Sequence, residues 1–170
     1  MDKAMDIELR GFKHHKGLSR ETEAFTALLF VDGKKIAEVL NDGNGGATNI
    51  SHLGNQKTNT STRDDVRTFE EWCDKQPRLD GLDMDAEFYI DLMAQRIIRT
   101  RELHRLCKKN VVVRIEGESD FFDDTHINTS IYKGEYTRKR AESIRKIHEG
   151  KNQPNLIEIY NERFDYTLVK

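Results

Sequence analysis

The feature that most constrains this fold is a hairpin that runs into a glycine-rich loop, within residues 24–50. Residues 25–31 and 35–40 favour strands, and Asp32-Gly33 between them is a strong signal for a two-residue hairpin turn. Three glycines in four positions of the following loop allow positive φ angles and a close approach of the backbone to a ligand. We therefore expect the loop to leave the sheet after the hairpin and to form a binding site. It reads Asn41-Asp42-Gly43-Asn44-Gly45-Gly46.

Hydrophobic periodicity predicts the remaining elements. Helices are expected over residues 62–76, 85–109 and 137–149, and further strands over residues 5–12, 111–115, 127–132 and 156–160. A chain of 170 residues is long enough to bury one substantial core. The predicted fold is α+β. It is a single domain over residues 1–170, with a largely antiparallel five- or six-stranded sheet packed against about three helices.

The helix ends carry recognisable capping signals. Thr62 and Thr137 are expected N-caps of the first and last helices, and either Asp83 or Asp85 caps the long central helix. Asn110 is expected to end the central helix in the left-handed conformation. These assignments fix the helix boundaries to within a few residues.

The apolar residues of the helices indicate which sides are buried. Phe69 and Trp72 are expected to anchor the first helix on the sheet, while Ala141, Ile144 and Ile147 face inward in the last. The central helix has a broader apolar stripe than one sheet face requires. A second helix or a homo-oligomer partner would both cover the remainder.

Residues 51–62 are almost entirely polar, which predicts a surface loop. Loops longer than about 12 residues without structure of their own are uncommon and are often functional. Two interpretations stay open. Residues 43–62, which join the glycine-rich loop to this segment, are either a flap over the site or an accessory loop without a function of its own.

Composition limits the classes of partner. The formal net charge is −2, so general nucleic-acid binding is not expected and a charged partner would need a local patch. No stretch approaches the roughly 18 apolar residues of a membrane span, and the amino terminus lacks the apolar core of a signal peptide. We therefore expect a cytoplasmic protein. Cys73 and Cys107 are expected to be free buried thiols.

Common catalytic motifs are absent from the sequence. It contains no GxxxxGK[ST], no GxGxxG opening a helix, no GxSxG and no HExxH, which removes support for the commonest nucleotide hydrolases, dinucleotide enzymes, serine hydrolases and zinc proteases. His52 lies just beyond the glycine-rich loop, where an imidazole can donate to a phosphate or a base edge. No partner for acid-base catalysis is visible beside it, and the sequence favours a protein that is not an enzyme, without a cofactor.

The hairpin and loop, AFTALLFVDGKKIAEVLNDGNGGATNI, resemble a group of small, largely uncharacterised proteins of phages and mobile elements. KGEYTRKRAESIRKIHEG with NLIEIYNE behind it resembles them less closely, and the middle helices carry no matching motif. The resemblance implies an accessory, anti-defence role in a host cytoplasm. It brings no established catalytic residues to carry over.

The leading hypothesis is a non-enzymatic sponge that sequesters a phosphorylated nucleotide or a cyclic-nucleotide signal. Backbone N–H groups of the loop would meet the phosphate, and nearby side chains would bond the base or sugar. Arginines on the polar side of the central helix would neutralise charge, although their position near the negative end of the helix dipole favours a role in offsetting that dipole. The candidate ligand-binding residues are Asn41, Asp42, Gly43, Asn44, Gly45, Gly46, Thr48, Asn49, His52, Arg99, Arg101 and Arg105.

Two alternatives remain open. An acidic cluster with a nearby histidine would suit a metal-dependent phosphodiesterase or nuclease, because carboxylates bind Mg²⁺ and Mn²⁺. The other alternative is an inhibitor that binds a host defence enzyme through the residue 51–62 loop or the hairpin edge. The residues of the acidic cluster are Asp120, Asp123, Asp124 and His126.

Overall fold

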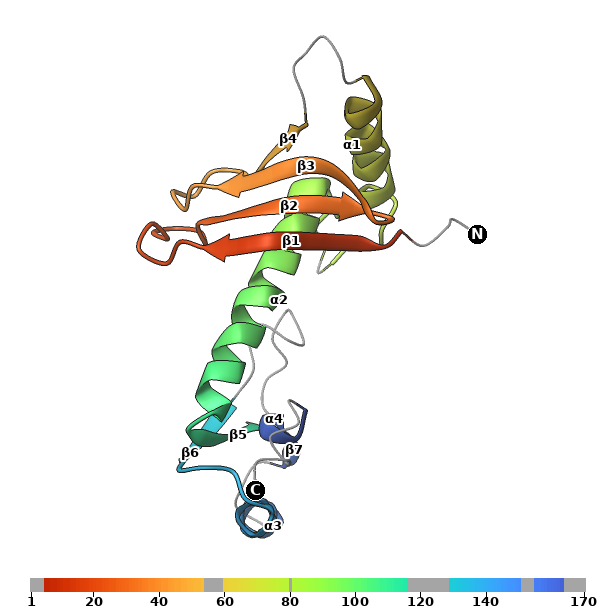
Figure 1. Cartoon of the computed structure of the whole chain (residues 1–170). Helices are drawn as coiled ribbons and strands as arrows, with labels where there is room; N and C mark the ends of the chain where they lie inside the picture. The colour runs from red at the N-terminus through yellow and green to blue at the C-terminus, as the bar shows by residue number, and fades with distance from the viewer. Residues whose placement is uncertain (1–4, 54–59, 80, 116–128, 151–154, 164–170) are drawn as a thin grey trace. The chain divides into compact units, whose positions relative to one another are not determined.

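A computed structural model describes residues 5–53, 60–79, 81–115, 129–150 and 155–163 (Figure 1). The predicted α+β class is confirmed, but the strands form two antiparallel sheets, of four and three strands, where one sheet was predicted. Two compact units, Met1–Gln95 and Arg96–Lys170, divide the chain within its longest helix. The elements in order are β1 (Ile7–His14), β2 (Phe25–Val31), β3 (Lys34–Asn41), β4 (Asn49–His52), α1 (Thr60–Cys73), α2 (Ala86–Cys107), β5 (Asn110–Ile115), β6 (Thr129–Lys133), α3 (Arg138–His148), β7 (Leu156–Ile159) and α4 (Tyr160–Arg163).

The first unit is built on the four-stranded meander β1-β2-β3-β4. Val31 pairs with Lys34 across the predicted hairpin turn, and Asp32 and Gly33 have φ angles of 49° and 77°. Two successive positive φ angles are those of a type I′ turn, whose twist matches the twist of the strands it joins. The hairpin prediction is therefore confirmed, with β3 one residue longer at each end than expected.

The core of the first unit lies on one face of this sheet. Phe25 and Leu29 of β2 are buried there, and Phe12 of β1 stacks on Phe25 with ring centroids 5.3 Å apart. Helix α1 packs against β3 and β4 through its apolar side, where Phe69 is fully buried. Trp72 of α1 is half-buried. The burial of Phe69 agrees with the predicted anchor of α1, whereas the Trp72 ring packs edge-on against Tyr89 of α2, with ring centroids 5.5 Å apart.

The boundaries of α1 and α2 differ from the prediction by one to three residues, because α1 spans Thr60–Cys73 instead of 62–76 and α2 spans Ala86–Cys107 instead of 85–109. Thr62 is not the N-cap of α1 but lies inside it, and its hydroxyl donates to the carbonyl of Leu53 over 2.8 Å. Asp85 caps α2, because its carboxylate accepts the N–H of Phe88 over 2.8 Å. The predicted polar loop over residues 51–62 is shorter than expected, since residues 51–52 belong to β4 and residues 60–62 to α1, while residues 54–59 lie outside the described residues.

The second unit has three layers, with the sheet β6-β5-β7 in the middle. Successive residues of a strand point to opposite faces. Val111 and Val113 of β5 therefore pack with Ala141 and Ile144 of α3, while Val112 on the other face packs with the end of α2 and with α4. Burial on both faces explains why three consecutive residues of β5, 111–113, are all apolar.

Three local predictions in this unit are corrected. Asn110 begins β5 instead of capping α2 in the left-handed conformation, and its amide donates to the carbonyl of Leu106 over 3.1 Å. Ile147 is exposed, and His148 is the buried residue near the end of α3. The closing strand ends at Ile159, because Tyr160 starts the short helix α4. Thr137 caps α3 as predicted, accepting the N–H of Arg140.

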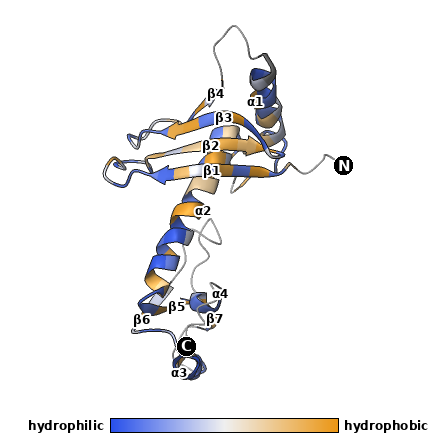
Figure 2. Ribbon diagram, in the orientation of Figure 1, coloured by the Kyte–Doolittle hydropathy of each residue, from blue (hydrophilic) through white to orange (hydrophobic). Residues whose placement is uncertain are grey.

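Hydropathy changes along α2. Figure 2 shows mainly hydrophobic residues in its first half and mainly hydrophilic residues in the half that belongs to the second unit. The apolar stripe of α2, which looked continuous in the sequence, therefore contributes residues to the cores of both units. Among the helices in the described residues, none has the length and apolar character needed to cross a membrane.

Candidate functional site

The glycine-rich loop connects β3 to β4 across residues 42–48. Its two ends are held in register, because Leu40 of β3 pairs with Asn49 of β4. The expectation that the loop leaves the sheet is thus corrected, since the chain returns at once as a fourth strand. A short strand of mixed polar sequence, Asn49-Ile50-Ser51-His52, gave no periodic signal strong enough to reveal this return.

Asn41, the last residue of β3, organises the loop. Its side chain is 2% exposed, and its Oδ1 accepts the Thr22 hydroxyl and the Gly43 N–H, each over 2.9 Å. Its Nδ2 donates to the Thr48 hydroxyl over 2.9 Å and to the Gly46 carbonyl over 3.4 Å. Both polar atoms of the amide are therefore occupied inside the protein, which assigns Asn41 a structural role.

Gly43 allows a close approach, but the approaching group belongs to the chain itself. Its carbonyl accepts the N–H groups of Arg20 and Glu21 over 2.9 and 3.0 Å. Its φ is 82°, and a Cβ there would lie 2.5 Å from the carbonyl oxygen of Leu18 and 2.8 Å from the Cβ of Ala24. The loop thus clamps the segment between β1 and β2, residues 15–24.

The loop N–H groups are largely used within the protein. The N–H of Gly43 donates to Asn41, that of Asn44 to the Asp42 carboxylate over 3.0 Å, and that of Gly45 to the Thr22 hydroxyl over 3.3 Å. The bonds from Asn44 hold the pKa of Asp42 below its ordinary value. A phosphate on this loop would have to replace these acceptors, which costs part of the binding energy.

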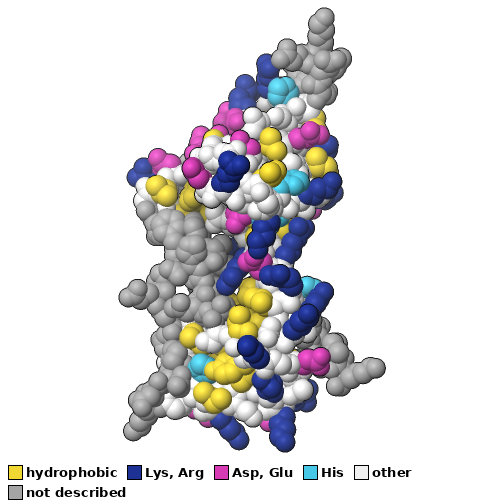
Figure 3. Space-filling view, turned by 90° about the vertical axis from the view of Figure 1, so that its left-hand side faces the viewer, with side chains coloured by type: hydrophobic (Ala, Val, Ile, Leu, Met, Phe, Trp, Pro, Cys, Tyr) yellow, Lys and Arg dark blue, Asp and Glu magenta, His cyan; other side chains and the backbone are white. Residues whose placement is uncertain are grey.

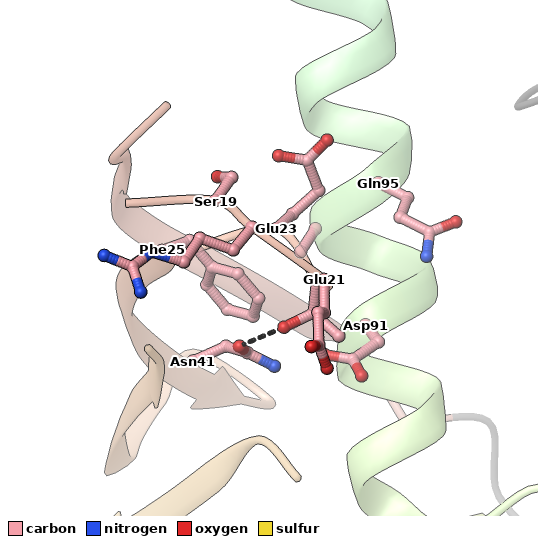
Figure 4. Close-up of a pocket in the computed structure, with 10 residues that line it drawn as sticks. Ser19, Glu21, Glu23, Phe25, Asn41, Asp91 and Gln95 are labelled. Atoms are coloured by element: carbon pink, nitrogen blue, oxygen red, sulfur yellow. Dashed lines mark hydrogen bonds between the residues drawn. The ribbon is translucent and has the colours of Figure 1, made fainter. Parts of the chain in front are cut away.

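A hollow of about 330 Å³ lies beside the clamped segment (Figure 4). Its walls come from the β1–β2 connection, from Asn41 and from the first turns of α2. Figure 4 shows Glu21 of the β1–β2 connection beside Asp91 of α2, with Gln95 one turn further along that helix. Of the charged side chains that line it, three are carboxylates and one is a guanidinium. They are Glu21, Glu23, Asp91 and Arg20.

Asp91 joins α2 to the end of the glycine-rich loop. Its Oδ1 accepts the Thr48 hydroxyl over 2.5 Å. Burial raises the pKa of Asp91 above its ordinary value; the Thr48 hydrogen bond opposes this rise, and the charge of Asp85 adds to it. Sequence reasoning missed Asp91, although an acidic residue directly after the buried Ile90 was an available signal.

The remaining candidates in the first unit lie outside the walls of this hollow. Asp42 and Asn44 are exposed at the loop tip. Asn49 is exposed on β4, where its Oδ1 accepts the Ser51 hydroxyl over 2.6 Å. His52 is half-buried and pairs with Ala37 in the sheet. Thr48 contributes through Asp91, so only Asn41 among the predicted residues lines the hollow itself.

The three predicted arginines belong to the second unit. Arg99 is half-buried, with a guanidinium nitrogen 4.0 Å from the Glu102 carboxylate, whereas Arg101 and Arg105 are exposed. They form a separate basic group on α2, and the loop residues form their own group in the first unit.

The acidic cluster of the alternative enzyme hypothesis, Asp120 to His126, lies outside the described residues. Within the described ranges, no group of three or more His, Cys, Asp and Glu side chains is arranged to hold a metal ion. Burial raises the pKa of Cys73 to about 12 and that of Cys107 to about 11, so both thiols stay protonated and are poor nucleophiles.

The hollow therefore offers more hydrogen-bond acceptors than donors, on walls that the clamped connection and α2 hold in place. Such a surface can bind a cation or a donor-rich molecule. Comparisons with protein families, with characterised proteins and with solved structures found no match to this chain. The functional inference accordingly rests on the geometry and charge of this unit.

Proposed function

We propose that this protein binds a small polar ligand carrying a protonated amine, in the hollow between the β1–β2 connection and α2, and releases it unchanged. The observation that carries the proposal is the lining of the hollow. Carboxylates of Glu21, Glu23 and Asp91 share a space of about 330 Å³ with a single cation, Arg20. An ammonium group would be drawn to this surplus of negative charge.

The charge of the whole first unit supports a cationic ligand. Residues 1–95 contain 12 Lys and Arg against 18 Asp and Glu, a formal net charge of −6. A field of this sign raises the local concentration of cations and lowers that of anions. An ammonium near Asp91 would also offset the penalty of holding its carboxylate ionised in a partly buried place.

Binding without chemical turnover agrees with the way the polar groups of the site are held by internal hydrogen bonds. Its polar walls are held by hydrogen bonds among the chain's own groups, as at Asn41 and Gly43. Glu23 is paired with His14, whose Nε2 lies 2.7 Å from the Glu23 Oε2. Fixed acceptors of this kind lower the entropic cost of binding a small ligand.

A phosphorylated nucleotide or cyclic-nucleotide signal, captured by a phage anti-defence sponge, is the second candidate. Arg20 favours it, because a guanidinium in the hollow can grip a phosphate bidentately. Carboxylates and the amide of Gln95 would then bond ribose hydroxyls and base edges. The three carboxylates disfavour ligands with several phosphates.

The test is calorimetric titration of the full chain with spermidine, lysine and glucosamine, and in parallel with AMP, cyclic AMP and cyclic di-GMP. The proposal expects an amine to bind and to be recovered intact. Asp91→Asn and Glu21→Gln each remove one charge-assisted hydrogen bond of roughly 1.5–3 kcal/mol, which weakens binding about 10- to 100-fold. Glu70→Gln, an exposed carboxylate on α1 away from the hollow, is the matched control.

Each other outcome has a defined meaning. Binding of nucleotides alone would replace the amine with the second candidate. Consumption of any ligand would make the protein an enzyme. Binding of none of these ligands would reject the hollow as a small-molecule site and leave the inhibitor hypothesis, which a stable complex with a host enzyme would support.

A further inference from the structure

The total charge of −2 conceals a strong asymmetry between the two units. Residues 96–170 contain 16 Lys and Arg against 12 Asp and Glu, a formal net charge of +4, whereas the first unit carries −6. Opposite charge on separate compact units indicates separate partners. The anion-binding function that the sequence assigned to the glycine-rich loop is better suited to the second unit.

Basic residues of the second unit follow one another along the chain at the end of α2. Arg101 and Arg105 are one helical turn apart and exposed, and Lys108 continues the row. At 1.5 Å per residue, the four-residue step from Arg101 to Arg105 places these two residues about 6 Å apart along the helix, and Lys108 follows directly after its end. Lys109 then extends the row into the turn that leads to β5.

The row continues onto the sheet and the next helix. Asn110, directly after Lys109, pairs with Lys133 at the end of β6. The guanidinium of Arg140 from α3 donates to the Lys133 carbonyl and lies against Gly134. The end of α2, the end of β6 and the start of α3 thus form one basic surface, made of Arg101, Arg105, Lys108, Lys109, Lys133 and Arg140.

Few carboxylates neutralise this surface. Within the described part of the second unit, carboxylates pair with Arg99 and Arg145, and none pairs with Lys108, Lys109 or Lys133. Three acidic residues lie next to members of the surface in the chain: Glu102 directly after Arg101, Glu135 two positions beyond Lys133, and Glu142 two positions beyond Arg140. Figure 3 shows Lys and Arg side chains gathered over this part of the chain, with few acidic side chains among them.

We propose that the second unit binds the phosphate backbone of a nucleic acid through this basic surface. The alternative anionic partner, a membrane, is less suited to it. Helices that lie on membranes also insert large apolar side chains. Of the exposed large hydrophobic residues of the described chain, none lies on α2 or in the turn after it, and the other elements of the surface expose one each, Ile131 of β6 and Ile147 of α3. A backbone-directed contact of Lys and Arg is independent of base sequence.

Fluorescence anisotropy of the full chain with labelled 20-nucleotide single-stranded DNA, the matching duplex and the RNA equivalent tests the proposal. Six phosphate contacts predict a slope of about −5 in log affinity against log salt concentration for duplex DNA, from roughly −0.9 per contact. The triple variant Arg105→Gln, Lys108→Gln, Lys109→Gln should reduce this slope by about 3 and weaken binding at 50 mM salt at least tenfold.

A charge-matched control separates a surface contact from a general effect of net charge. Lys16→Gln, Arg63→Gln, Lys75→Gln removes one Arg and two Lys from exposed positions in the first unit, and should leave the affinity within about twofold of wild type. Far-UV circular dichroism checks that both triple variants are folded. If the Arg105 variant unfolds, Lys133→Gln alone should reduce the slope by about 1.

Three results would overturn the proposal. The first is the absence of binding to all three nucleic acids at 50 mM salt. The second is equal weakening by the two triple variants, which would reduce the effect to net charge. The third is binding to vesicles of phosphatidylserine and phosphatidylcholine, but to none of the nucleic acids, which would make the surface a membrane contact.

Discussion

The hydroxyl of Thr48 donates a 2.5 Å hydrogen bond to the Oδ1 of Asp91. Thr48 is buried at the end of the glycine-rich loop, and Asp91 stands in the second turn of α2. This single bond joins the loop, which clamps the β1–β2 connection, to the helix that forms the opposite wall of the hollow. The walls of the proposed ligand site are therefore set by packing within the first unit.

The charge of Asp91 should make stability depend on pH. Burial raises the pKa of Asp91, so the folded state holds its proton more tightly than the unfolded chain does. The stabilisation that protonated Asp91 adds to the folded state is fully present below its ordinary pKa near 3.8. This stabilisation is lost as the pH rises through the raised pKa of the folded protein. Asp91→Asn keeps an acceptor for Thr48 without the charge. Its melting temperature relative to wild type should therefore be higher at pH 7 than at pH 3.5.

Calorimetric scans at the two pH values give this difference directly, and Asp74→Asn, an exposed change on the same unit, provides the baseline. A difference between Asp91→Asn and wild type that stays constant from pH 3.5 to pH 7 would contradict the raised pKa.

Substitutions of three glycines should separate backbone strain from steric overlap. Gly46→Ala meets open space and should change the free energy of unfolding by less than about 0.5 kcal/mol. Gly33→Ala meets open space at a φ of 77° and should cost about 1–2 kcal/mol. Gly43→Ala adds overlap with Leu18 and Ala24 and should cost about 3 kcal/mol or more.

Urea unfolding followed by fluorescence measures this series, because the single tryptophan, Trp72, lies in the first unit. Equal costs at Gly33 and Gly43 would mean that the β1–β2 connection moves away without penalty, and that the clamp does not exist in solution.

Asn161 should be the most sensitive polar residue of the second unit. It is fully buried; its Oδ1 accepts the Val112 N–H over 2.8 Å, and its Nδ2 donates to the carbonyls of Cys107 and Asn110 over 3.0 and 2.8 Å. Asn161→Ala leaves these three groups without partners and should reduce the free energy of unfolding by about 3 kcal/mol or more. Ser143→Ala, exposed on α3, is the control in urea unfolding followed by circular dichroism. A loss below about 1 kcal/mol would exclude this role.

Both cysteine thiols should resist modification in the native protein. Burial raises the pKa of Cys73 to about 12 and that of Cys107 to about 11, so the reactive thiolate is scarce at pH 8 and the sulfur is covered. The disulfide reagent DTNB should therefore react slowly with native protein and label both thiols rapidly in 8 M urea. Rapid labelling of one thiol before unfolding would show that its surroundings open locally.

Much of the local structure was predictable. Asp32-Gly33 sets its own turn through two positive φ angles, and Asp85 and Thr137 cap helices with side chains that reach N–H groups three residues away. These signals depend on neighbours in the chain. The β5 strand was equally clear, because an apolar run buried on both faces needs no alternation.

The errors have a common physical origin in contacts between distant segments. Ile147 and His148 both suit the end of an amphipathic helix, and the hydroxyl of Tyr132, 2.8 Å from the His148 Nε2, favours burial of the histidine. The β4 strand depends on pairing with β3, and the polar sequence of residues 49–52 does not predict that pairing.

By itself, the sequence determined the α+β class, the hairpin, the helix caps at Asp85 and Thr137 and the need for glycine at positive φ, because each depends on local backbone energetics or on one-sided hydrophobic patterns. Only the tertiary structure decided what the glycines approach, which carboxylates share the hollow, and that a chain of net charge −2 divides into units of opposite charge. Those properties depend on which distant segments meet, and packing of whole elements sets that choice.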